Sequence, residues 1–149
     1  MNIITLHTTI DAPIETVFDL ARSIDFHQQS ASKTKETAIA GVTTGLIGYN
    51  QTVTWKGKHF GSYLTHQSKI TAYRYPTYFS DTQLKGHFTY FHHEHIFTQV
   101  DQKVCMKDIL YYSVPYGVIG RLFNWLLLRK HLTSFLQHRN NLLKDRLER

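Results

Sequence analysis

The segment 118–147 constrains the fold more than any other part of this chain, because it is long and its apolar residues follow a helical period. Apolar side chains recur along it at Val118, Leu122, Trp125, Leu132, Leu136, Leu143 and Leu147. A helix over this segment would be about 45 Å long, more than a small sheet needs for cover. Residues from about 33 to 114 instead favour strands, since they are rich in β-branched and aromatic side chains and show no helical period.

Turn residues divide the strand-rich region into about six strands. The turn signals fall at Ala40-Gly41, Lys56-Gly57, Tyr75-Pro76, Lys85-Gly86 and Asp101-Gln102. An alternating, Thr- and Ile-rich strand over residues 3–10 adds a seventh. Such short connections are typical of antiparallel hairpins. The sequence therefore predicts an α+β fold with a seven-stranded curved antiparallel sheet around the long C-terminal helix.

Two short helices are predicted directly after the first strand. Asp11 is a plausible N-cap with Pro13 in the first turn, and apolar residues follow at helical spacing at Ile14, Val17, Phe18 and Ala21. A second helix is expected from Ser23 to Gln29. No repeat, low-complexity tract or linker interrupts the chain, so we expect one domain over residues 1–149.

Charge and cysteine content favour a cytoplasmic protein that does not bind nucleic acid. The net charge of +6 comes from 17 basic and 11 acidic residues. The basic residues gather only in the last helix, at Arg129, Lys130, Arg139, Lys144, Arg146 and Arg149, which we interpret as a solvated face. The single cysteine, Cys105, suits a reducing compartment, and residues 1–13 do not resemble a secretory signal. No phosphate loop, CxxC pair or HExxH motif is present, so we expect no cofactor.

The hairpin from Thr89 to Val114 contains the most informative polar residues. With its turn at Asp101-Gln102, the opposed pairs are Phe97 with Met106, His95 with Asp108, His93 with Leu110 and Phe91 with Tyr112. Side chains alternate along strands, so all eight lie on one face together with Val104 and Val114. This face is more apolar than the other, and we predict that it points to the interior.

The opposed pair His95 and Asp108 has three interpretations. It can be a buried pair that fixes the hairpin register, a polar anchor at the bottom of a ligand pocket, or a general acid/base. A buried carboxylate needs a partner, and opposed Cβ atoms about 4.5–5.5 Å apart allow a hydrogen bond. A metal site built from His93, His95 and Asp108 is not expected, because residues two apart on a strand are separated by about 6.6 Å.

Two further features bear on a pocket. Trp55 could approach the histidines from an earlier strand, and Asp81 and Gln83 are polar residues within an aromatic strand. Asp81 is either a secondary pocket residue or a solvent contact near the strand end, because a bulge at the Lys85-Gly86 turn would change the register.

The start of the last helix, from Val118 to Leu128, is apolar nearly all round. A helix on the surface normally needs only an apolar stripe. The apolar side chains outside such a stripe are explained either by burial under a loop or in a homodimer, or by contact with an anionic membrane. In the membrane contact, Arg121, Arg129 and Lys130 would meet lipid phosphates.

Several motifs occur in an order that resembles a known superfamily. They are Ile10-Asp11-Ala12-Pro13, Val53-Thr54-Trp55, Ile70-Thr71, Tyr75-Pro76 with Phe79, Asp81, Gln83 and Gly86, then His93, His95 and Phe97, Asp108, and Pro115-Tyr116-Gly117. Together they resemble the START/Bet v 1-like (SRPBCC, polyketide cyclase-like) superfamily, in particular an uncharacterised bacterial ligand-binding subfamily. The resemblance implies a helix-grip fold with an apolar cavity. Members include lipid and sterol carriers, hormone receptors, aromatic cyclases and chaperone activators, so the fold alone does not fix the function. The glycine-rich GxGGxG loop of plant members is missing here.

These observations favour binding or transport of a hydrophobic small molecule, lipid-like, quinone or aromatic, over catalysis. The alternatives are a cyclase, dehydratase or hydrolase that uses His95 and Asp108 as acid/base, and a protein-interaction module built on the apolar helix start. The expected ligand-binding residues are Trp55, Phe79, Asp81, Phe91, His93, His95, Phe97, Met106, Asp108, Leu110, Tyr112 and Trp125.

Overall fold

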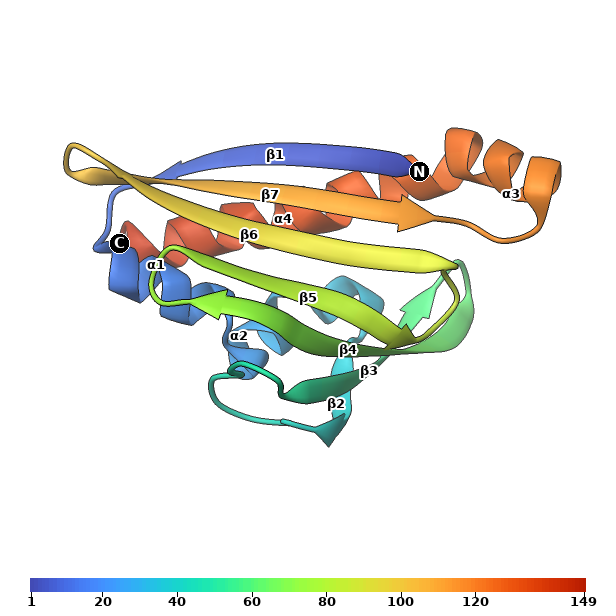
Figure 1. Cartoon of the computed structure of the whole chain (residues 1–149), viewed down its shortest axis with the longest axis horizontal. Coiled ribbons are helices and arrows are strands. Elements are labelled where there is room, and N and C mark those ends of the chain that lie inside the picture. Colours follow the sequence, from blue (N-terminus) through green and yellow to red (C-terminus); the bar gives the residue numbers. More distant parts are fainter.

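The computed structural model describes residues 1–149 and contains one seven-stranded antiparallel sheet, as predicted (Figure 1). Its strands run in the spatial order β1-β7-β6-β5-β4-β3-β2. Their bounds are β1 Asn2–Ile10, β2 Thr37–Gly41, β3 Thr52–His59, β4 Ser62–Arg74, β5 Tyr78–Lys85, β6 Tyr90–Val100 and β7 Lys103–Ser113. Only β1 lies out of sequence order, because the chain leaves it through two helices and returns to pair with it through β7.

The helices lie on the concave side of the sheet and at its end (Figure 1). They are α1 (Ile14–Ala21), α2 (Ile24–Ser30), the short 3₁₀ turn η1 (Ser32–Thr34), α3 (Gly117–Phe123), the π-helical turn η2 (Asn124–Leu128) and α4 (Arg129–Leu147). Ser23 caps α2 by accepting a hydrogen bond from the Phe26 amide at 3.1 Å. The prediction that Asp11 caps α1 was wrong, since Pro13 occupies that position without a side-chain cap.

The register of the β6–β7 hairpin is confirmed. Phe97 pairs with Met106, His95 with Asp108, His93 with Leu110 and Phe91 with Tyr112. Alternate residues of β7 are fully buried, which confirms the predicted interior face. The hydrophobic alternation and a short turn fix this register locally, because a slip by one residue would turn every apolar side chain outward.

The expected turn at Lys56-Gly57 was wrong. Gly57 lies inside β3, and the chain turns at Phe60-Gly61 instead, where both residues have positive φ. A side chain at Gly57 would overlap the carboxylate of Glu36, so this glycine marks a close approach and not a bend.

The last helix is continuous from Gly117 to Leu147, and its predicted apolar stripe is confirmed at Leu136 and Leu143 but was wrong in the first part. Val118, Leu122 and Trp125 are exposed, whereas Gly120, Asn124 and Leu128 are buried. The π-helical turn η2 contains more residues per turn than an α-helix, so it shifts the inward face by about one residue. Asn124 replaces Trp125 on this face, accepting a hydrogen bond from the Tyr112 hydroxyl at 2.6 Å.

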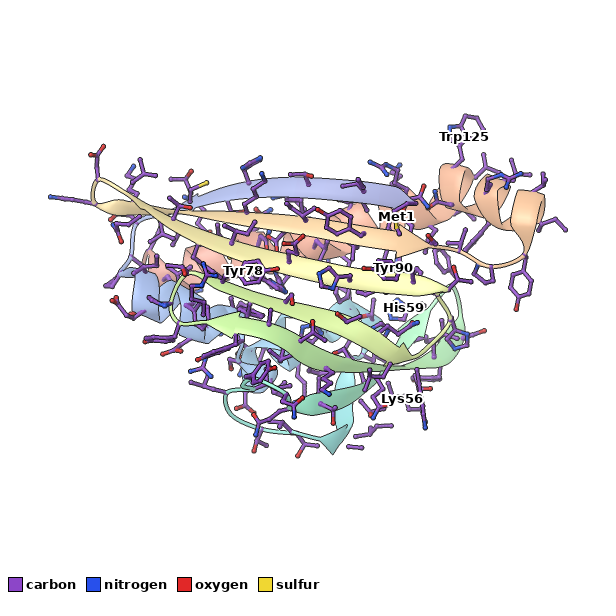
Figure 2. The ribbon with its side chains drawn as sticks, in the orientation of Figure 1. Met1, Lys56, His59, Tyr78, Tyr90 and Trp125 are labelled. Atoms are coloured by element: carbon purple, nitrogen blue, oxygen red, sulfur yellow. The ribbon has the colours of Figure 1, made fainter.

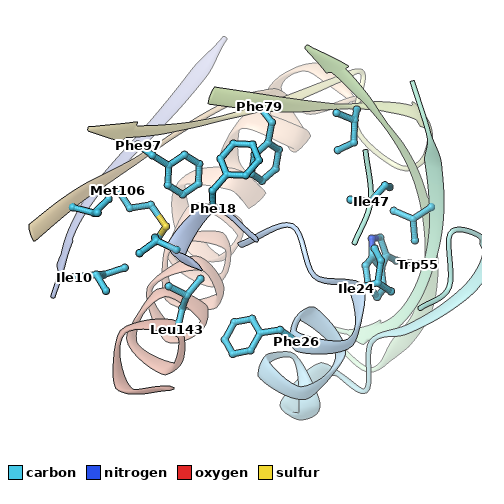
Figure 3. Close-up of a cluster of buried hydrophobic side chains, with 14 residues drawn as sticks. Ile10, Phe18, Ile24, Phe26, Ile47, Trp55, Phe79, Phe97, Met106 and Leu143 are labelled. Atoms are coloured by element: carbon cyan, nitrogen blue, oxygen red, sulfur yellow. The ribbon is translucent and has the colours of Figure 1, made fainter. Parts of the chain in front are cut away.

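Two hydrophobic clusters hold the helix on the sheet. The larger one surrounds Phe18 on α1, whose ring packs edge-on against four aromatic rings and lies in the side-chain group drawn in Figure 3. The smaller one consists of Ile4, Leu110, Tyr112, Leu128 and Leu136. On both β7 and α4, the residues between the two clusters are polar, and these polar residues form the candidate site.

Candidate functional site

A cavity of about 670 Å³ lies between the concave sheet and the helices, and most of its lining residues are hydrophobic. Its volume falls within the range of small-molecule sites, about 300–1,000 Å³. The side chains in Figure 3 stand around part of this space, with Trp55 on one side and Phe79 on another. The core is therefore incomplete in its centre.

Seven of the twelve predicted ligand-binding residues line the cavity: Trp55, Phe79, Asp81, Phe91, His93, His95 and Leu110. Four others, Phe97, Met106, Asp108 and Tyr112, do not line it and are fully packed into the interior. Trp125 is 77% exposed and points away from the molecule (Figure 2). Its expected place in the pocket was wrong, because the π-helical turn rotates it outward.

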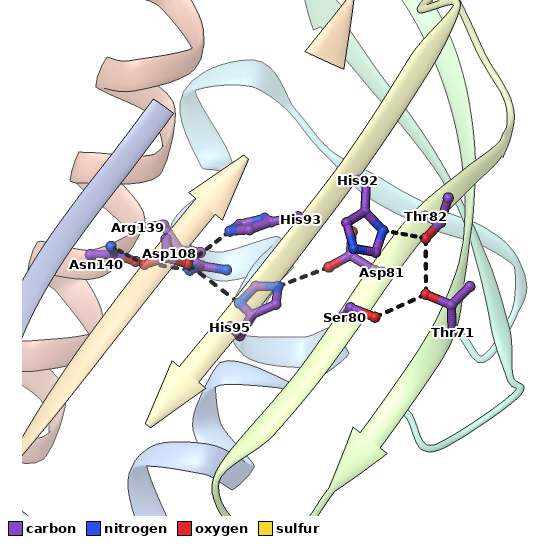
Figure 4. A network of polar contacts seen from close by, with 10 residues as sticks. All are labelled: Thr71, Ser80, Asp81, Thr82, His92, His93, His95, Asp108, Arg139 and Asn140. Carbon is purple, nitrogen blue, oxygen red and sulfur yellow. Dashed lines mark hydrogen bonds and ion pairs between the residues drawn. The ribbon is translucent and has the colours of Figure 1, made fainter. Parts of the chain in front are cut away.

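Asp108 is the centre of a buried hydrogen-bond network (Figure 4). Its Oδ1 accepts from His93 Nε2 at 2.8 Å and from Arg139 Nη2 at 2.9 Å, and its Oδ2 accepts from Asn140 Nδ2 at 2.7 Å. Arg139 also donates to the Asn140 side chain, through Nε at 3.1 Å. The carboxylate therefore has partners on both oxygens, as a buried charge requires.

The expected hydrogen bond between His95 and Asp108 is not the one that forms. His95 Nδ1 lies 3.4 Å from Asp108 Oδ1 without a hydrogen bond, whereas His95 Nε2 pairs with Asp81 Oδ2 at 2.8 Å. The two residues are opposed as predicted, but each makes its shorter bond to another residue. Asp81 on β5 is therefore a member of the network and lines the cavity. Of the two predicted alternatives, it is a residue of the pocket and not a solvent contact at the strand end.

His93 presents a free ring nitrogen. An ionised Asp108 can only accept, so the proton of a neutral His93 must lie on Nε2, which leaves Nδ1 as an acceptor. Nδ1 of His93 makes no hydrogen bond within the protein, but it is not fully enclosed. Nδ1 of His95 also lacks a partner, but that atom is fully enclosed. Since His93 lines the cavity, Nδ1 is available to a bound molecule.

The network separates the pKa values of its members. Burial by itself would raise the pKa of Asp108, but the charge of Arg139 and the bond from His93 hold it well below its usual value. Burial likewise opposes ionisation of Asp81, yet the bond from His95 lowers the Asp81 pKa to about 2. Burial and the neighbouring His95 lower the pKa of His93, whereas the two carboxylates outweigh burial and raise the pKa of His95. His95 is therefore the member that holds a proton most readily.

Arg139 and Asn140 were not predicted as site residues. Arg139 was assigned to a solvated basic face, but only 6% of it is exposed. A signal was present, because both residues fall between Leu136 and Leu143 in the helical stripe that packs on the sheet. Polar residues at inward positions of a helix indicate a buried polar partner on the facing strand.

Asp81, His93 and His95 also bring three donor atoms within 4.8 Å of one another, close enough to consider a metal ion. Strand geometry predicted that His93 and His95 are about 6.6 Å apart, but their ring centroids are only 3.9 Å apart. However, the rings stack with an angle of only 28° between their planes. In-plane nitrogen lone pairs of stacked rings do not converge on one point, so an ion would require a ring to leave its carboxylate. That no metal is bound stays a prediction.

Stability is expected to decrease in acid as these carboxylates become protonated. The pKa of Asp81 is lowered from 3.8 to about 2, and that of Asp108 is also lowered, so both stabilise the folded state above the unfolded-state pKa. This contribution is lost as the pH falls from about 4 towards the folded-state values. Urea unfolding at several pH values measures it. Asp81→Asn should flatten the acid side of the curve, and an unchanged curve would contradict the pairing with His95.

Comparison with solved structures identifies the fold. The protein TTHA0849 from Thermus thermophilus superposes with a TM-score of 0.75 over 95% of this chain and 97% of its own, at 14% identity. A START superfamily protein from Mycobacterium smegmatis gives 0.73 over 98% and 97%, at 15% identity. The major latex-like protein 151 of Panax ginseng gives 0.67 over 98% and 97%, at 11% identity.

No family model matches the sequence, and neither does any curated protein. The structural matches confirm the START/Bet v 1-like helix-grip fold that the motifs predicted. At such low identities they establish the fold alone, and the function has to be argued from the site.

Proposed function

We propose that this protein binds a hydrophobic small molecule, lipid-like, quinone or aromatic, in the cavity between the sheet and α4. The observation that carries the proposal is an apolar cavity of about 670 Å³ that also exposes Asp81 and His93. Apolar contacts would supply most of the affinity, at about 25 cal/mol per Å² of buried apolar surface. Asp81 and Nδ1 of His93 would accept hydrogen bonds from the polar end of the ligand. The lone cysteine suits a cytoplasmic carrier.

Filling the cavity should weaken binding without unfolding the protein. Ser68 is buried and lines the cavity, so Ser68→Trp places an indole in the empty space. We expect its affinity for the neutral fluorophore N-phenylnaphthylamine to fall by about tenfold or more, since the indole takes up apolar surface that the fluorophore would cover. Fluorescence titration measures this, and native mass spectrometry of the wild type would reveal a co-purified molecule.

Lys69→Trp is the matched control, because Lys69 is the next residue on β4 and does not line the cavity. It should bind the fluorophore as the wild type does. Wild-type protein that carries no molecule and does not bind the fluorophore would contradict the proposal.

A second candidate function, general acid/base catalysis, is favoured by one observation. The bond from His93 Nε2 to Asp108 leaves Nδ1 of this cavity-lining histidine free, and its lowered pKa keeps it neutral. A neutral histidine held in this way can accept a proton from a bound molecule. His93, and not His95, would therefore be the base. Conversion of a co-purified ligand that stops in His93→Gln would identify an enzyme, whereas binding without conversion supports a carrier.

We further propose that the exposed face of α3 and η2 contacts an anionic membrane. Val118, Ile119, Leu122, Trp125 and Leu126 are each more than half exposed, which is unusual for adjacent large apolar side chains. The basic residues Arg121, Arg129 and Lys130 lie among them and are also exposed. Ile119 lines the cavity as well, so this face adjoins the ligand site. No helix is long and apolar enough to cross a bilayer, so the contact would be peripheral.

A further inference from the structure

A second polar group faces the same cavity from its other side. Glu36 lies directly before β2, His27 lies on α2, and His59 ends β3. Oε1 of Glu36 is 3.7 Å from His27 Nε2, and Oε2 is 3.7 Å from His59 Nε2. All three residues line the cavity, together with Asp81 and His93 of the first polar group.

The carboxylate of Glu36 has no hydrogen-bond donor within the protein. Both histidine contacts exceed hydrogen-bond distance, and only 11% of the side chain is exposed. Nε2 of His27 is likewise enclosed without a partner. Burial would raise the pKa of Glu36, but His27 and His59 lower it to about 2, so it is ionised at neutral pH. Neither oxygen of Glu36 is among the fully enclosed atoms without a partner, so the carboxylate is accessible but has no donor within the protein, and a molecule in the cavity can supply one.

The surrounding residues hold this group in place. The His27 ring lies over Trp55 with ring centroids 4.1 Å apart, and His59 Nδ1 is 3.0 Å from His131 Nε2. The β3 backbone leaves space for the carboxylate, because a side chain at Gly57 would overlap it. These contacts hold the two histidines beside Glu36, and all three side chains line the cavity.

The two polar groups lie on different parts of the sheet. Asp81 and His93 come from β5 and β6, whereas His59 comes from β3, and β4 separates these strands. Apolar residues such as Ile70 and Phe91 line the cavity as well. The β4 residues His66 and Ser68 also line the cavity, so a molecule that reaches both groups must be long enough to span β4 and polar at two separate points.

We infer that Glu36, with His27 and His59, forms a second polar subsite that accepts a hydrogen bond from a hydroxyl or amine at the far end of the ligand. This inference rests on the proposed function. It specifies the class of ligand as a two-ended amphipathic molecule, such as a long-chain diol, an amino alcohol or a polyphenol.

Competition for the cavity tests the inference. The competitors are alkane diols with a hydroxyl at each end, from octane to tetradecane, and mono-alcohols of the same lengths. Their affinities are measured by displacement of N-phenylnaphthylamine. Glu36→Leu should lower the diol-to-mono-alcohol affinity ratio by about tenfold, as expected for the loss of a hydrogen bond to a charged group. The mono-alcohol affinity itself should be unchanged. Glu15→Leu, which removes an exposed carboxylate from α1, should keep the wild-type ratio.

Amino alcohols distinguish the two donor chemistries. If the donor is an ammonium group, Glu36→Gln should lose the preference for amino alcohols while it keeps part of the preference for diols. If Glu36→Leu is unstable, Gly57→Ala provides a second variant, because the added methyl group crowds the carboxylate without removing it.

Two negative outcomes separate the two proposals. An equal diol-to-mono-alcohol affinity ratio in the wild type and in Glu36→Leu would overturn the second subsite, and water would then be the partner of Glu36. Cavity binding would remain intact in that case. No fluorophore binding to the wild type would overturn the cavity proposal itself.

Discussion

Replacing Arg139 with methionine is expected to lower the free energy of unfolding by about 3–5 kcal/mol, the usual cost of removing one partner from a buried ion pair. Asp108 is 1% exposed and keeps its charge because the Arg139 guanidinium lies 2.9 Å from its Oδ1. Without that charge, the histidine and asparagine donors remain, but the carboxylate charge is no longer compensated by a permanent cation. Urea unfolding monitored by circular dichroism measures the loss.

Two further variants identify the cause. Arg121→Met removes an exposed arginine from α3 and should change stability by less than about 0.5 kcal/mol. Adding Asp108→Asn to Arg139→Met should recover part of the loss, because no unpaired charge then stays buried. The comparison needs Asp108→Asn alone as well. If the double variant loses as much stability as Arg139→Met and Asp108→Asn lose in sum, the two residues do not act as a pair.

Replacing Val118 and Trp125 with serine is expected to weaken binding to anionic vesicles by at least about a hundredfold, since burial of each large apolar side chain contributes about 1.5–3 kcal/mol. Both residues are exposed, at 69% and 77%, and neither lines the cavity, so the fold and the ligand site should be unaffected. Sedimentation with vesicles of phosphatidylglycerol and phosphatidylcholine measures binding. Wild-type binding should weaken as salt screens the contacts of Arg121, Arg129 and Lys130.

The matched control replaces two exposed apolar residues far from α3 in the sequence, Ile39 and Tyr49, with serine. This control should bind vesicles as the wild type does. A wild-type protein that does not sediment with anionic vesicles at low salt would remove the membrane proposal. Size-exclusion chromatography and pull-down with the Val118/Trp125 variant would then test whether a second copy or a protein partner covers the face.

The sequence alone predicted the features that depend on local periodicity. Alternation along β6 and β7 and a turn at Asp101-Gln102 were sufficient to pair His95 with Asp108 and to identify the buried face. The motif order predicted the helix-grip fold, and the long apolar period predicted its last helix. For the hairpin and the helix the determining contacts lie within one element, so short-range rules apply, whereas the fold was predicted from the resemblance.

The inward phase of α3 was not predictable in the same way. A single π-helical turn places Asn124 and not Trp125 in the buried position, where it meets the Tyr112 hydroxyl of another element. No local pattern in 124–128 indicates it, because a leucine-rich segment satisfies either phase. Trp125, which was expected in the pocket, is therefore exposed.

The sequence thus determined the sheet, its hairpin register and which face of the hairpin points inward, because these follow from alternation and turn chemistry close in the chain. Only the tertiary structure decided which groups share a proton or a charge. Asp108 meets Arg139 across 31 positions, and Glu36 meets His59 because β2, which begins directly after Glu36, pairs with β3. A hydrogen bond depends on distances of tenths of an ångström between atoms on separate elements, and residue spacing in a sequence does not contain that information.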